Sequence, residues 1–355
     1  MLPAVVFSTE NMHMTLTNHT FSCIILLRKN LMRRTGSPDF RHCSGKCAMK
    51  PKIAAVVGPT ASGKTALSIA LAKQFDGEII SCDSMQIYRG MDIGTAKPTP
   101  DEMCGIPHHM IDILEPSESF SAAEYAPRAK SAVADILSRG KLPIFCGGTG
   151  LYLDAVLTDN DYADVETDPE LRAALLADAD RDGPHALWER LRAVDPHAAA
   201  ATHENNVKRV ARALEIYLAS GITKTEWDAK SRLREPPYDA VILALDWERE
   251  ELYRRIDLRV DGMMEAGLPD EVRTLLESGR LTRNSSAAQA IGYKEFIDYF
   301  DGHITLAEAA DQIKLASRRY AKRQLTWFRR NPAVNWIKPD GNFEVIVNIA
   351  SKLLT

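Results

Sequence analysis

The segment 58–65 has the residue types and spacing of a phosphate-binding loop. It consists of Gly58, Pro59, Thr60, Ala61, Ser62, Gly63, Lys64 and Thr65, between a short apolar run and a helical pattern. Such a loop turns consecutive backbone N–H groups toward a phosphate, and the following helix N-terminus adds positive potential. The Lys64 ammonium is expected to reach the outer phosphates and the Thr65 hydroxyl to bind Mg²⁺. We therefore expect a Mg²⁺-dependent site for a diphosphate or a nucleotide such as ATP.

A second candidate is the acid that follows the next predicted strand. Most proteins with this loop carry an acidic residue at the end of a later strand, where it holds the metal. In this sequence the later strand, 142–146, ends in Gly147-Gly148-Thr149, and the acid is instead Asp83, directly after the run 77–82. An Asp that opens a loop is also a common backbone cap, so a structural and a chemical role both remain open for Asp83.

Short apolar runs define the elements that must position these residues. The runs 52–57, 77–82, 142–146 and 240–245 predict strands, and the stretches 66–75 and 121–138 predict helices. Alternating strands and helices predict an α/β fold with a doubly wound parallel sheet of the P-loop NTPase type. Ligands bind beyond the carboxyl ends of the strands in such sheets, so 58–65, Asp83-Ser84 and 147–149 should meet in one pocket.

The chain is predicted to have several segments around this core. Residues 167–235 show helical patterns at 169–180, 184–193 and 205–219 without strand candidates, which predicts an inserted helical domain. We expect residues 49–166 to form the first part of the core. Residues 236–340 should complete the core and add a helical C-terminal region, with helices at 249–266, 269–276, 289–300 and 306–329. Residues 341–355 are expected to be a C-terminal tail.

Composition excludes several classes of protein. The 355 residues are 45% hydrophobic and 26% charged, which is typical of a globular chain of about two domains. No run of 18 apolar residues is present, so no membrane-spanning helix is expected. The net charge of −4 argues against a general polyanion binder, and a role with nucleic acid would need local basic clusters.

Two such clusters are present. Eight Lys and Arg residues and no acid lie between Asp311 and Asp340, and Lys314, Arg318 and Lys322 recur every four residues, with Arg319 and Arg323 beside them. A second cluster, Lys208, Arg209 and Arg212, lies in the predicted insertion. An ordinary solvated helix face is the alternative, but the missing acids favour a surface for nucleic acid.

The first 48 residues differ from the rest. They contain six Lys or Arg against Glu10 and Asp39, and no helical or strand period. We expect a disordered extension, with Met49 as the working start, and a mitochondrial transit peptide is the alternative. Cys43 and Cys47 with His42 have near-metal spacing, but we expect reduced thiols in a cytoplasmic protein because none of the six cysteines follows residue 146.

Several motifs together resemble the tRNA dimethylallyltransferases, also called tRNA isopentenyltransferases or the IPP transferase family. The resemblance lies in the phosphate-binding loop and in the stretches 83–97, 108–112, 147–152, 209–215, 257–263, 289–293 and 322–329. It covers residues 52 to 337, and the combination is specific. One departure is Asn205-Asn206, where the family pattern has Asn-Asp.

The resemblance implies a reaction and roles for residues. A dimethylallyl group passes from dimethylallyl diphosphate to the exocyclic amine of the adenosine 3′ of the anticodon, in tRNAs that decode codons beginning with U. Lys64, Mg²⁺ on Thr65 and Arg259 would neutralise the departing diphosphate. Asp83 would orient the amine and accept its proton, and Thr149 would align the allylic diphosphate. Ser84, Met85 and Gln86 would hold the flipped base.

The same resemblance implies partners. The basic residues named above would bind the anticodon stem-loop of a tRNA, and a monomer is expected. Three other functions remain open on the residues alone: an adenylate isopentenyltransferase acting on free AMP or ATP, a P-loop kinase of a small metabolite, and a non-catalytic RNA-binding protein. The predicted insertion and the basic C-terminal helix disfavour the first, because a free nucleotide requires neither. The Gly147-Gly148-Thr149 strand end and the predicted insertion disfavour the kinase. The intact set of Lys64, Thr65, Asp83 and Thr149 disfavours the third.

Overall fold

The computed structural model describes residues 50–158, 168–232, 235–339 and 342–355. The expectations for residues 1–48, including the start at Met49 and the alternatives of a transit peptide or a zinc site at Cys43 and Cys47, lie outside these residues. Residues 50–355 form one compact unit.

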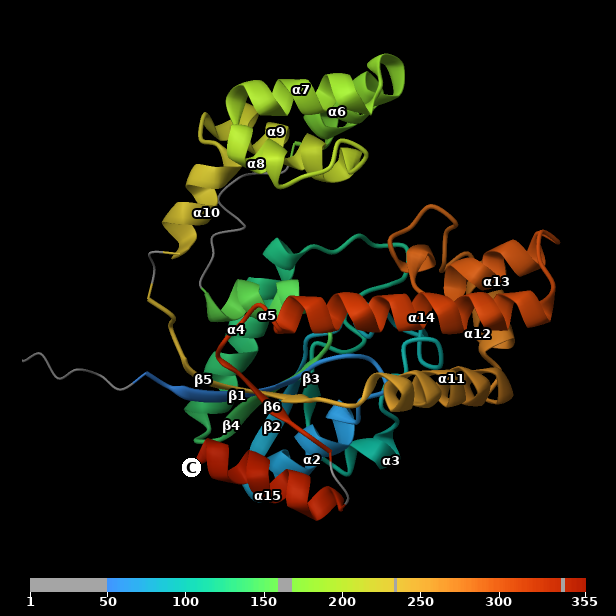
Figure 1. Cartoon of the computed structure of the whole chain (residues 1–355). Helices are drawn as coiled ribbons and strands as arrows, with labels where there is room; N and C mark the ends of the chain where they lie inside the picture. The colour runs from blue at the N-terminus through green and yellow to red at the C-terminus, as the bar shows by residue number, and fades with distance from the viewer. Residues whose placement is uncertain (1–49, 159–167, 233–234, 340–341) are drawn as a thin grey trace, which may run out of the picture. The chain divides into compact units, whose positions relative to one another are not determined.

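Six strands form one all-parallel sheet in the order β3-β2-β4-β1-β5-β6 (Figure 1). They are β1 (Lys52–Val57), β2 (Gly77–Ser81), β3 (His108–His109), β4 (Leu142–Gly147), β5 (Asp239–Leu245) and β6 (Val334–Ile337). The predicted α/β class with a parallel sheet is confirmed. The edge strands β3 and β6 were not predicted, because strands this short leave no apolar run in the sequence.

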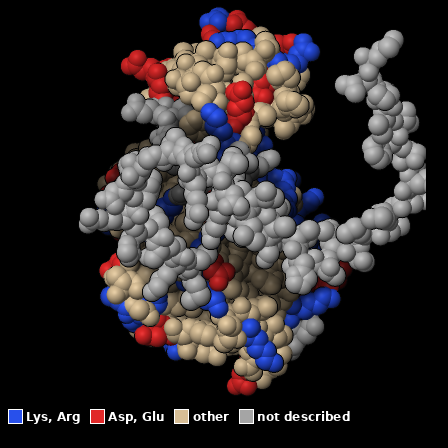
Figure 2. Space-filling view, turned by 90° about the vertical axis from the view of Figure 1, so that its left-hand side faces the viewer, with Lys and Arg blue, Asp and Glu red and all other residues tan. Residues whose placement is uncertain are grey.

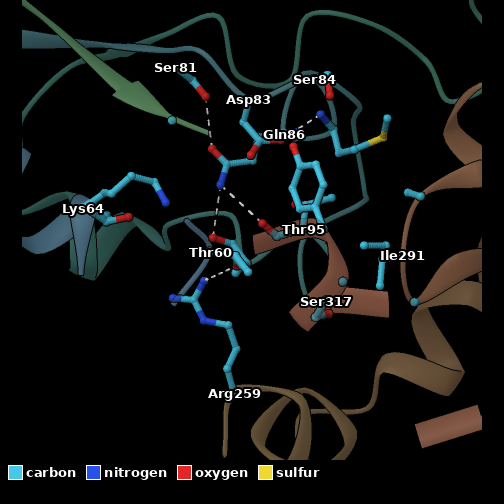
Figure 3. Close-up of a pocket in the computed structure, with 18 of the residues that line it drawn as sticks. Thr60, Lys64, Ser81, Asp83, Ser84, Gln86, Thr95, Arg259, Ile291 and Ser317 are labelled. Atoms are coloured by element: carbon cyan, nitrogen blue, oxygen red, sulfur yellow. Dashed lines mark hydrogen bonds between the residues drawn. The ribbon is translucent and has the colours of Figure 1, made fainter. Parts of the chain in front are cut away.

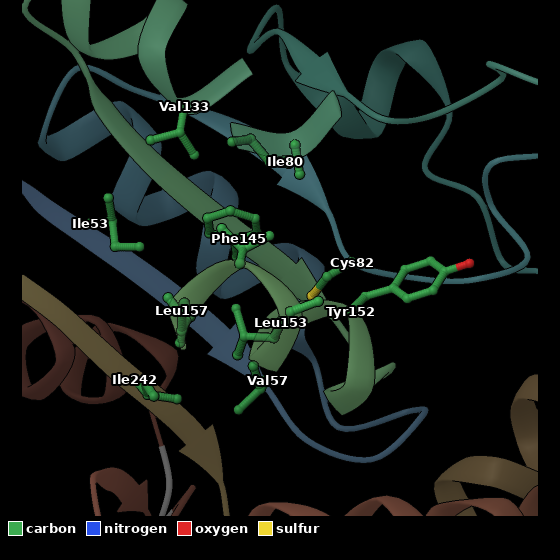
Figure 4. Close-up of a cluster of buried hydrophobic side chains, with 14 of the residues drawn as sticks. Ile53, Val57, Ile80, Cys82, Val133, Phe145, Tyr152, Leu153, Leu157 and Ile242 are labelled. Atoms are coloured by element: carbon green, nitrogen blue, oxygen red, sulfur yellow. The ribbon is translucent and has the colours of Figure 1, made fainter. Parts of the chain in front are cut away.

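Helices cover both faces of the sheet (Figure 1). On one face, α4 (Ala122–Ser138) and α5 (Gly150–Leu157) pack against residues such as Ile53, Val57 and Phe145, which Figure 4 shows as one cluster. On the other face, α2 (Lys64–Gln74) packs against Ala54 and Val56. Because successive residues of β1 point to opposite buried faces, the strand has a continuous apolar sequence. Ser121 and Glu124 form a capping box that begins α4, the helix predicted over 121–138.

The last residues form a helix, α15 (Phe343–Leu354), and the expectation of a tail was wrong. Ile346, Ala350 and Leu354 repeat every four residues and are buried in the cluster with α2, β5 and β6. The Lys52 ammonium donates a 2.6 Å hydrogen bond to the Leu354 carbonyl, which links the end of the chain to the first strand. The helix thus completes one layer of the core.

The region between β4 and β5 is helical in its described residues. It consists of α6 (Pro169–Asp182), α7 (Pro184–Val194), α8 (Pro196–Ala200), α9 (Val207–Ser220) and α10 (Lys224–Arg232). Leu175, Leu187, Leu191 and Val210 belong to a hydrophobic cluster of this region's own. Such a separate core is the property expected of an inserted helical domain.

Of the remaining helices, one follows β2 and the others lie between β5 and β6. They are α3 (Pro100–Met103), α11 (Arg249–Glu265), α12 (Leu268–Glu277), η1 (Ala287–Gln289), α13 (Tyr293–Phe300) and α14 (Leu306–Phe328). The predicted single helix 289–300 is wrong at its start. Gly292 has φ +98°, which a helix cannot accommodate, and its N–H donates to the Glu295 carboxylate at 2.8 Å to begin α13. Among the described residues, no helix has the length and apolar character needed to span a membrane.

Candidate active site

The phosphate-binding loop leaves β1 and enters α2 with two glycines in positive φ. Gly58 has φ +123° and Gly63 has φ +98°, conformations that side chains rarely allow. The Lys64 ammonium folds back over the loop and donates to the Pro59 carbonyl at 2.7 Å. Burial lowers the pKa of Lys64 to about 8, although the neighbouring Asp83 carboxylate favours its charged form. The loop therefore has the backbone and the cation that a phosphate group requires.

Helix α11 and Trp247 just before it support this loop, and sequence analysis predicted Arg259 but missed Arg255 and Trp247. Arg255 donates from Nε to the Ala61 carbonyl at 3.0 Å and lies over the Trp247 ring, 4.2 Å from its centroid. The Trp247 indole N–H donates to the Ser62 carbonyl at 2.8 Å. One turn along from Arg255, the Arg259 guanidinium lies 3.5 Å from the Thr60 hydroxyl, and burial lowers its pKa. The spacing of four residues from Arg259 is the sequence signal that could have identified Arg255.

The position of Asp83 is compatible with both of the roles that the sequence left open. Its Oδ1 accepts from the Met85 N–H at 2.9 Å and the Gln86 N–H at 3.4 Å, so it caps the turn after β2. It also lines the pocket described below. The Thr149 hydroxyl accepts from the Ser84 N–H at 3.1 Å and lies 3.3 Å from the Ser84 Oγ. The two strand-end loops are thus in direct contact.

Gln86 is held on three sides. Its Oε1 accepts from the Ser81 hydroxyl at 3.1 Å, and its Nε2 donates to the carbonyls of Thr95 and Ala96 at 3.3 and 3.2 Å (Figure 3). These hydrogen bonds fix the orientation of the amide. If Gln86 contacts a base, as predicted, it does so in this orientation.

The backbone that leads into the 94–96 loop is held by Glu271, a residue that sequence analysis also missed. The Glu271 carboxylate accepts from the N–H groups of Asp92, Ile93 and Gly94 at 2.9, 2.7 and 3.1 Å, and from the Tyr293 hydroxyl at 2.6 Å. A Cβ on Gly94 would lie 2.5 Å from the Tyr293 ring, which explains the glycine. The motifs 83–97 and 289–293, far apart in sequence, are thus parts of one structure.

The strand-end loops and helices α11 and α14 enclose a cavity of about 270 Å³. Its polar lining includes Thr60, Lys64, Thr65, Asp83, Arg259 and Arg323, and its apolar lining includes Met85, Ile256, Val260, Met263, Ile291 and Ile313. Figure 3 shows Lys64 and Ile291 on opposite sides of this pocket, with Asp83 and Ser84 along its edge. The predicted convergence of the phosphate loop, Asp83-Ser84 and the 147–149 loop is confirmed. The arrangement suits a small ligand with a charged and an apolar part.

Two of the basic residues predicted to bind tRNA from α14 are already paired with acidic residues. Arg318 forms a bidentate ion pair with Asp257 at 2.8 and 3.0 Å, and Lys314 pairs with Asp261 at 2.5 Å. Both partners lie on α11, outside the segment 311–340. The absence of acids from that segment therefore did not exclude these ion pairs. Arg319 and Lys322 are exposed, and no ion pair joins either of them to another described residue. Arg323 reaches the pocket instead.

The second basic cluster also contains both paired and exposed residues. Arg212 lies 3.0 Å from the fully buried Glu215, which also accepts from Arg172 at 2.9 and 2.7 Å, so Arg212 serves the core of the helical region. Lys208 and Arg209 are exposed on α9. On the face shown in Figure 2, basic and acidic side chains are intermixed wherever grey atoms leave them visible.

The pocket offers only a partial set of metal ligands. Within the described ranges, no three His, Cys, Asp or Glu side chains gather in a way that would hold a metal ion. The oxygen donors that line the cavity include the Thr65 hydroxyl and the Asp83 carboxylate. Mg²⁺ keeps several waters and commonly takes one or two protein oxygens together with substrate phosphates. The donor set therefore fits Mg²⁺ that arrives with a phosphorylated substrate.

Comparisons with known proteins place this site in a family. Residues 86–331 match the family model described as IPP transferase. The tRNA dimethylallyltransferase of Geobacillus thermodenitrificans is 53% identical over 288 residues, which is 81% of this chain and 90% of that protein. The Bacillus subtilis tRNA dimethylallyltransferase is 49% identical over 86% of this chain and 98% of its own length.

Solved structures agree. The full-length tRNA isopentenylpyrophosphate transferase from Bacillus halodurans is 48% identical, with a TM-score of 0.64, over 86% of this chain and 97% of that one. A eukaryotic dimethylallyltransferase acting on tRNA is 31% identical, with a TM-score of 0.71, over 81% of this chain and 74% of that one. The chain therefore belongs to the IPP transferase family of tRNA dimethylallyltransferases.

Proposed function

We propose that this enzyme transfers the dimethylallyl group of dimethylallyl diphosphate to the exocyclic amine, N6, of the adenosine 3′ of the anticodon in tRNAs that decode codons beginning with U. The observation that supports this proposal is the composition of a single cavity. A phosphate-binding loop, an acid at a strand end and an apolar wall line the same space. An allylic diphosphate has a charged and an apolar part, and the amine requires a proton acceptor.

The diphosphate lies on the phosphate-binding loop in this proposal. The N–H groups of 61–65, the Lys64 ammonium and the Arg259 guanidinium surround its oxygens, and their positive charge stabilises the leaving group. Lys64 exchanges its bond to the Pro59 carbonyl for a bond to phosphate. The dimethylallyl group faces apolar residues such as Ile256 and Val260, which are almost completely buried.

The amine approaches from the side of Asp83 and Thr149. As N6 forms its bond to C1 of the dimethylallyl group, the C1–O bond breaks, its electron pair leaves with the diphosphate, and one amine proton passes to Asp83. Adenine amines are poor nucleophiles, so the orientation given by Asp83 matters more than its basicity. Thr149 aligns the allylic diphosphate, and Ser84, Met85 and Gln86 contact the flipped base.

Mg²⁺ is part of the proposal. Thr65 and the substrate diphosphate would hold it, and it would supply further charge neutralisation on the leaving group. The exposed Arg319 and Lys322 on α14, Arg323 at the pocket, and Lys208 and Arg209 on α9 contact the phosphates of the anticodon stem-loop. A monomeric enzyme with a cytoplasmic location completes the proposal.

Incubation of the protein with unmodified tRNA, dimethylallyl diphosphate and Mg²⁺, followed by nucleoside mass analysis, tests the proposal. We expect adenosine in tRNA to gain the mass of one dimethylallyl group, and Lys64→Ala to weaken binding of the diphosphate far more than binding of tRNA. Gain of mass by AMP but not by tRNA would instead establish an adenylate isopentenyltransferase.

A further inference from the structure

One face of α14 forms a wall of the pocket. Ser317, Tyr320, Arg323 and Gln324 all line the cavity, and their spacing of three and four residues places them on one side of the helix. Gln324 is the most buried of the four, with an exposed fraction of 4%. A buried amide is stable only when its polar groups are hydrogen-bonded, so its partners indicate its purpose.

Both ends of the Gln324 amide bind the backbone of a catalytic loop. Its Oε1 accepts from the Thr60 N–H of the phosphate-binding loop at 2.9 Å. Its Nε2 donates to the Gly148 carbonyl, in the loop after β4, at 3.1 Å. Since β1 and β4 are neighbours in the sheet, the side chain spans the two strand ends that meet at the pocket.

The fit around this amide is tight. A Cβ on Gly148 would lie 1.9 Å from the Gln324 Nε2, and only a glycine allows the amide to approach the loop backbone this closely. Each end also adjoins a residue with a proposed role. The Thr60 hydroxyl lies 3.5 Å from Arg259, and Thr149, next to Gly148, accepts from the Ser84 N–H at 3.1 Å.

We propose that Gln324 is a positioning residue that sets the distance between the phosphate-binding loop and the Thr149 loop, and thereby aligns the diphosphate with the attacking amine. The inference rests on the residue roles proposed above. It explains why the side chain must have an acceptor at one end and a donor at the other. Methionine has nearly the same length but neither group, and ionised glutamate would direct an oxygen at the Gly148 carbonyl.

Gln324→Met tests the proposal directly. We expect the single-turnover rate of transfer at saturating tRNA and dimethylallyl diphosphate to fall about tenfold or more, because small misplacements of reacting groups are costly. Binding of tRNA should be unchanged. Gln74→Met is the matched control: Gln74 also joins two elements, through a 2.7 Å bond from the Ser351 hydroxyl, but lies outside the pocket and should keep the wild-type rate.

Gln324→Glu gives a readout that a space-filling role would not change. Burial raises the pKa of a carboxyl group, and the protonated form has a donor that can bind the Gly148 carbonyl. The rate of this variant relative to wild type should therefore rise as pH falls. Because the protonated form is close in shape to glutamine, this variant can still be tested if the Met variant fails to fold. A Met variant that loses less than tenfold, or a ratio for the Glu variant that does not change with pH, overturns the proposal. Transfer by the wild-type protein in the same assay tests the proposed function separately.

Discussion

In the proposed reaction, Asp83 has a structural and a chemical task for the same carboxylate. Its Oδ1 holds the N–H groups of Met85 and Gln86, while the carboxylate lines the pocket beside Lys64. A mutation to alanine would remove both tasks together. Asparagine keeps an oxygen acceptor for the turn and removes only the proton acceptor, so it separates the two.

We predict that Asp83→Asn lowers the single-turnover rate of transfer by about 10²–10⁴-fold, the usual contribution of a general base. Binding of tRNA should persist, because the turn is preserved. Asp135→Asn on α4, whose side chain pairs with Arg139 on the surface, is a control that should keep the wild-type rate. An Asp83→Asn rate above about a tenth of wild type would show that Asp83 is not the proton acceptor.

Lys64 makes diphosphate binding depend on pH. Burial lowers its pKa to about 8, so the ammonium form predominates below this pH and is lost above it. Bound diphosphate favours the charged form. The affinity for inorganic diphosphate in the presence of Mg²⁺ should therefore be greatest below pH 8 and decrease by up to about tenfold per pH unit above it.

Calorimetric titrations between pH 7 and about pH 9.5 measure this dependence, over a range in which Arg stays charged. Lys64→Arg should bind diphosphate with little change over this range, whatever its absolute affinity. If wild type and Lys64→Arg decline in parallel, the dependence arises from another group.

At the scale of the element, α14 has two different polar faces. One holds Tyr320 and Gln324 in the pocket, and the other exposes Arg319 and Lys322. Between them, Arg318 and Lys314 pair with Asp257 and Asp261 of α11. Among the described residues of α14, Arg319, Lys322 and the pocket residue Arg323 can contact a phosphate without breaking an ion pair.

We predict that Arg319→Glu combined with Lys322→Glu weakens tRNA binding and flattens its salt dependence by about two units of log–log slope, one for each phosphate contact. Binding of dimethylallyl diphosphate should not change. Titrations at several salt concentrations measure both quantities. Arg318→Gln, which removes a cation that is already paired, should leave the slope close to that of wild type, and an equal change in both variants would argue against the assignment.

At the scale of the whole molecule, α15 closes the face of the sheet that α2 covers. Ile346 has an exposed fraction of 6%, whereas Ile349 on the same helix has 41%. The two positions share residue type and helix, and differ mainly in burial. They form a matched pair for measuring what α15 contributes to the core.

We predict that Ile346→Ala lowers the free energy of unfolding by about 2–5 kcal/mol, the usual cost of removing a buried Ile side chain and leaving a cavity. Ile349→Ala should change it by no more than about 0.5 kcal/mol. Denaturant unfolding of both variants checks this. Similar values for the two would mean that the helix is not an integral part of the core.

Sequence patterns were sufficient to predict the parallel α/β sheet and the convergence of the three strand-end loops. These follow from local signals: continuous apolar runs, a glycine-rich loop before a helix, and the rule that parallel strands end at one edge. The motifs also identified the family. The edge strands were missed because they are too short to leave an apolar run, and the C-terminal helix was missed although Ile346, Ala350 and Leu354 repeat every four residues.

Which polar residues already have partners became clear from the three-dimensional fold alone. Arg318 looks like an exposed cation in sequence but pairs with Asp257. Gln324 and Glu271 look like ordinary helix residues but hold the backbone of distant loops. The physical reason is that a side chain's partner lies across space, 61 residues away for Arg318 and Asp257 and 264 for Gln324 and Thr60, where no local pattern records it.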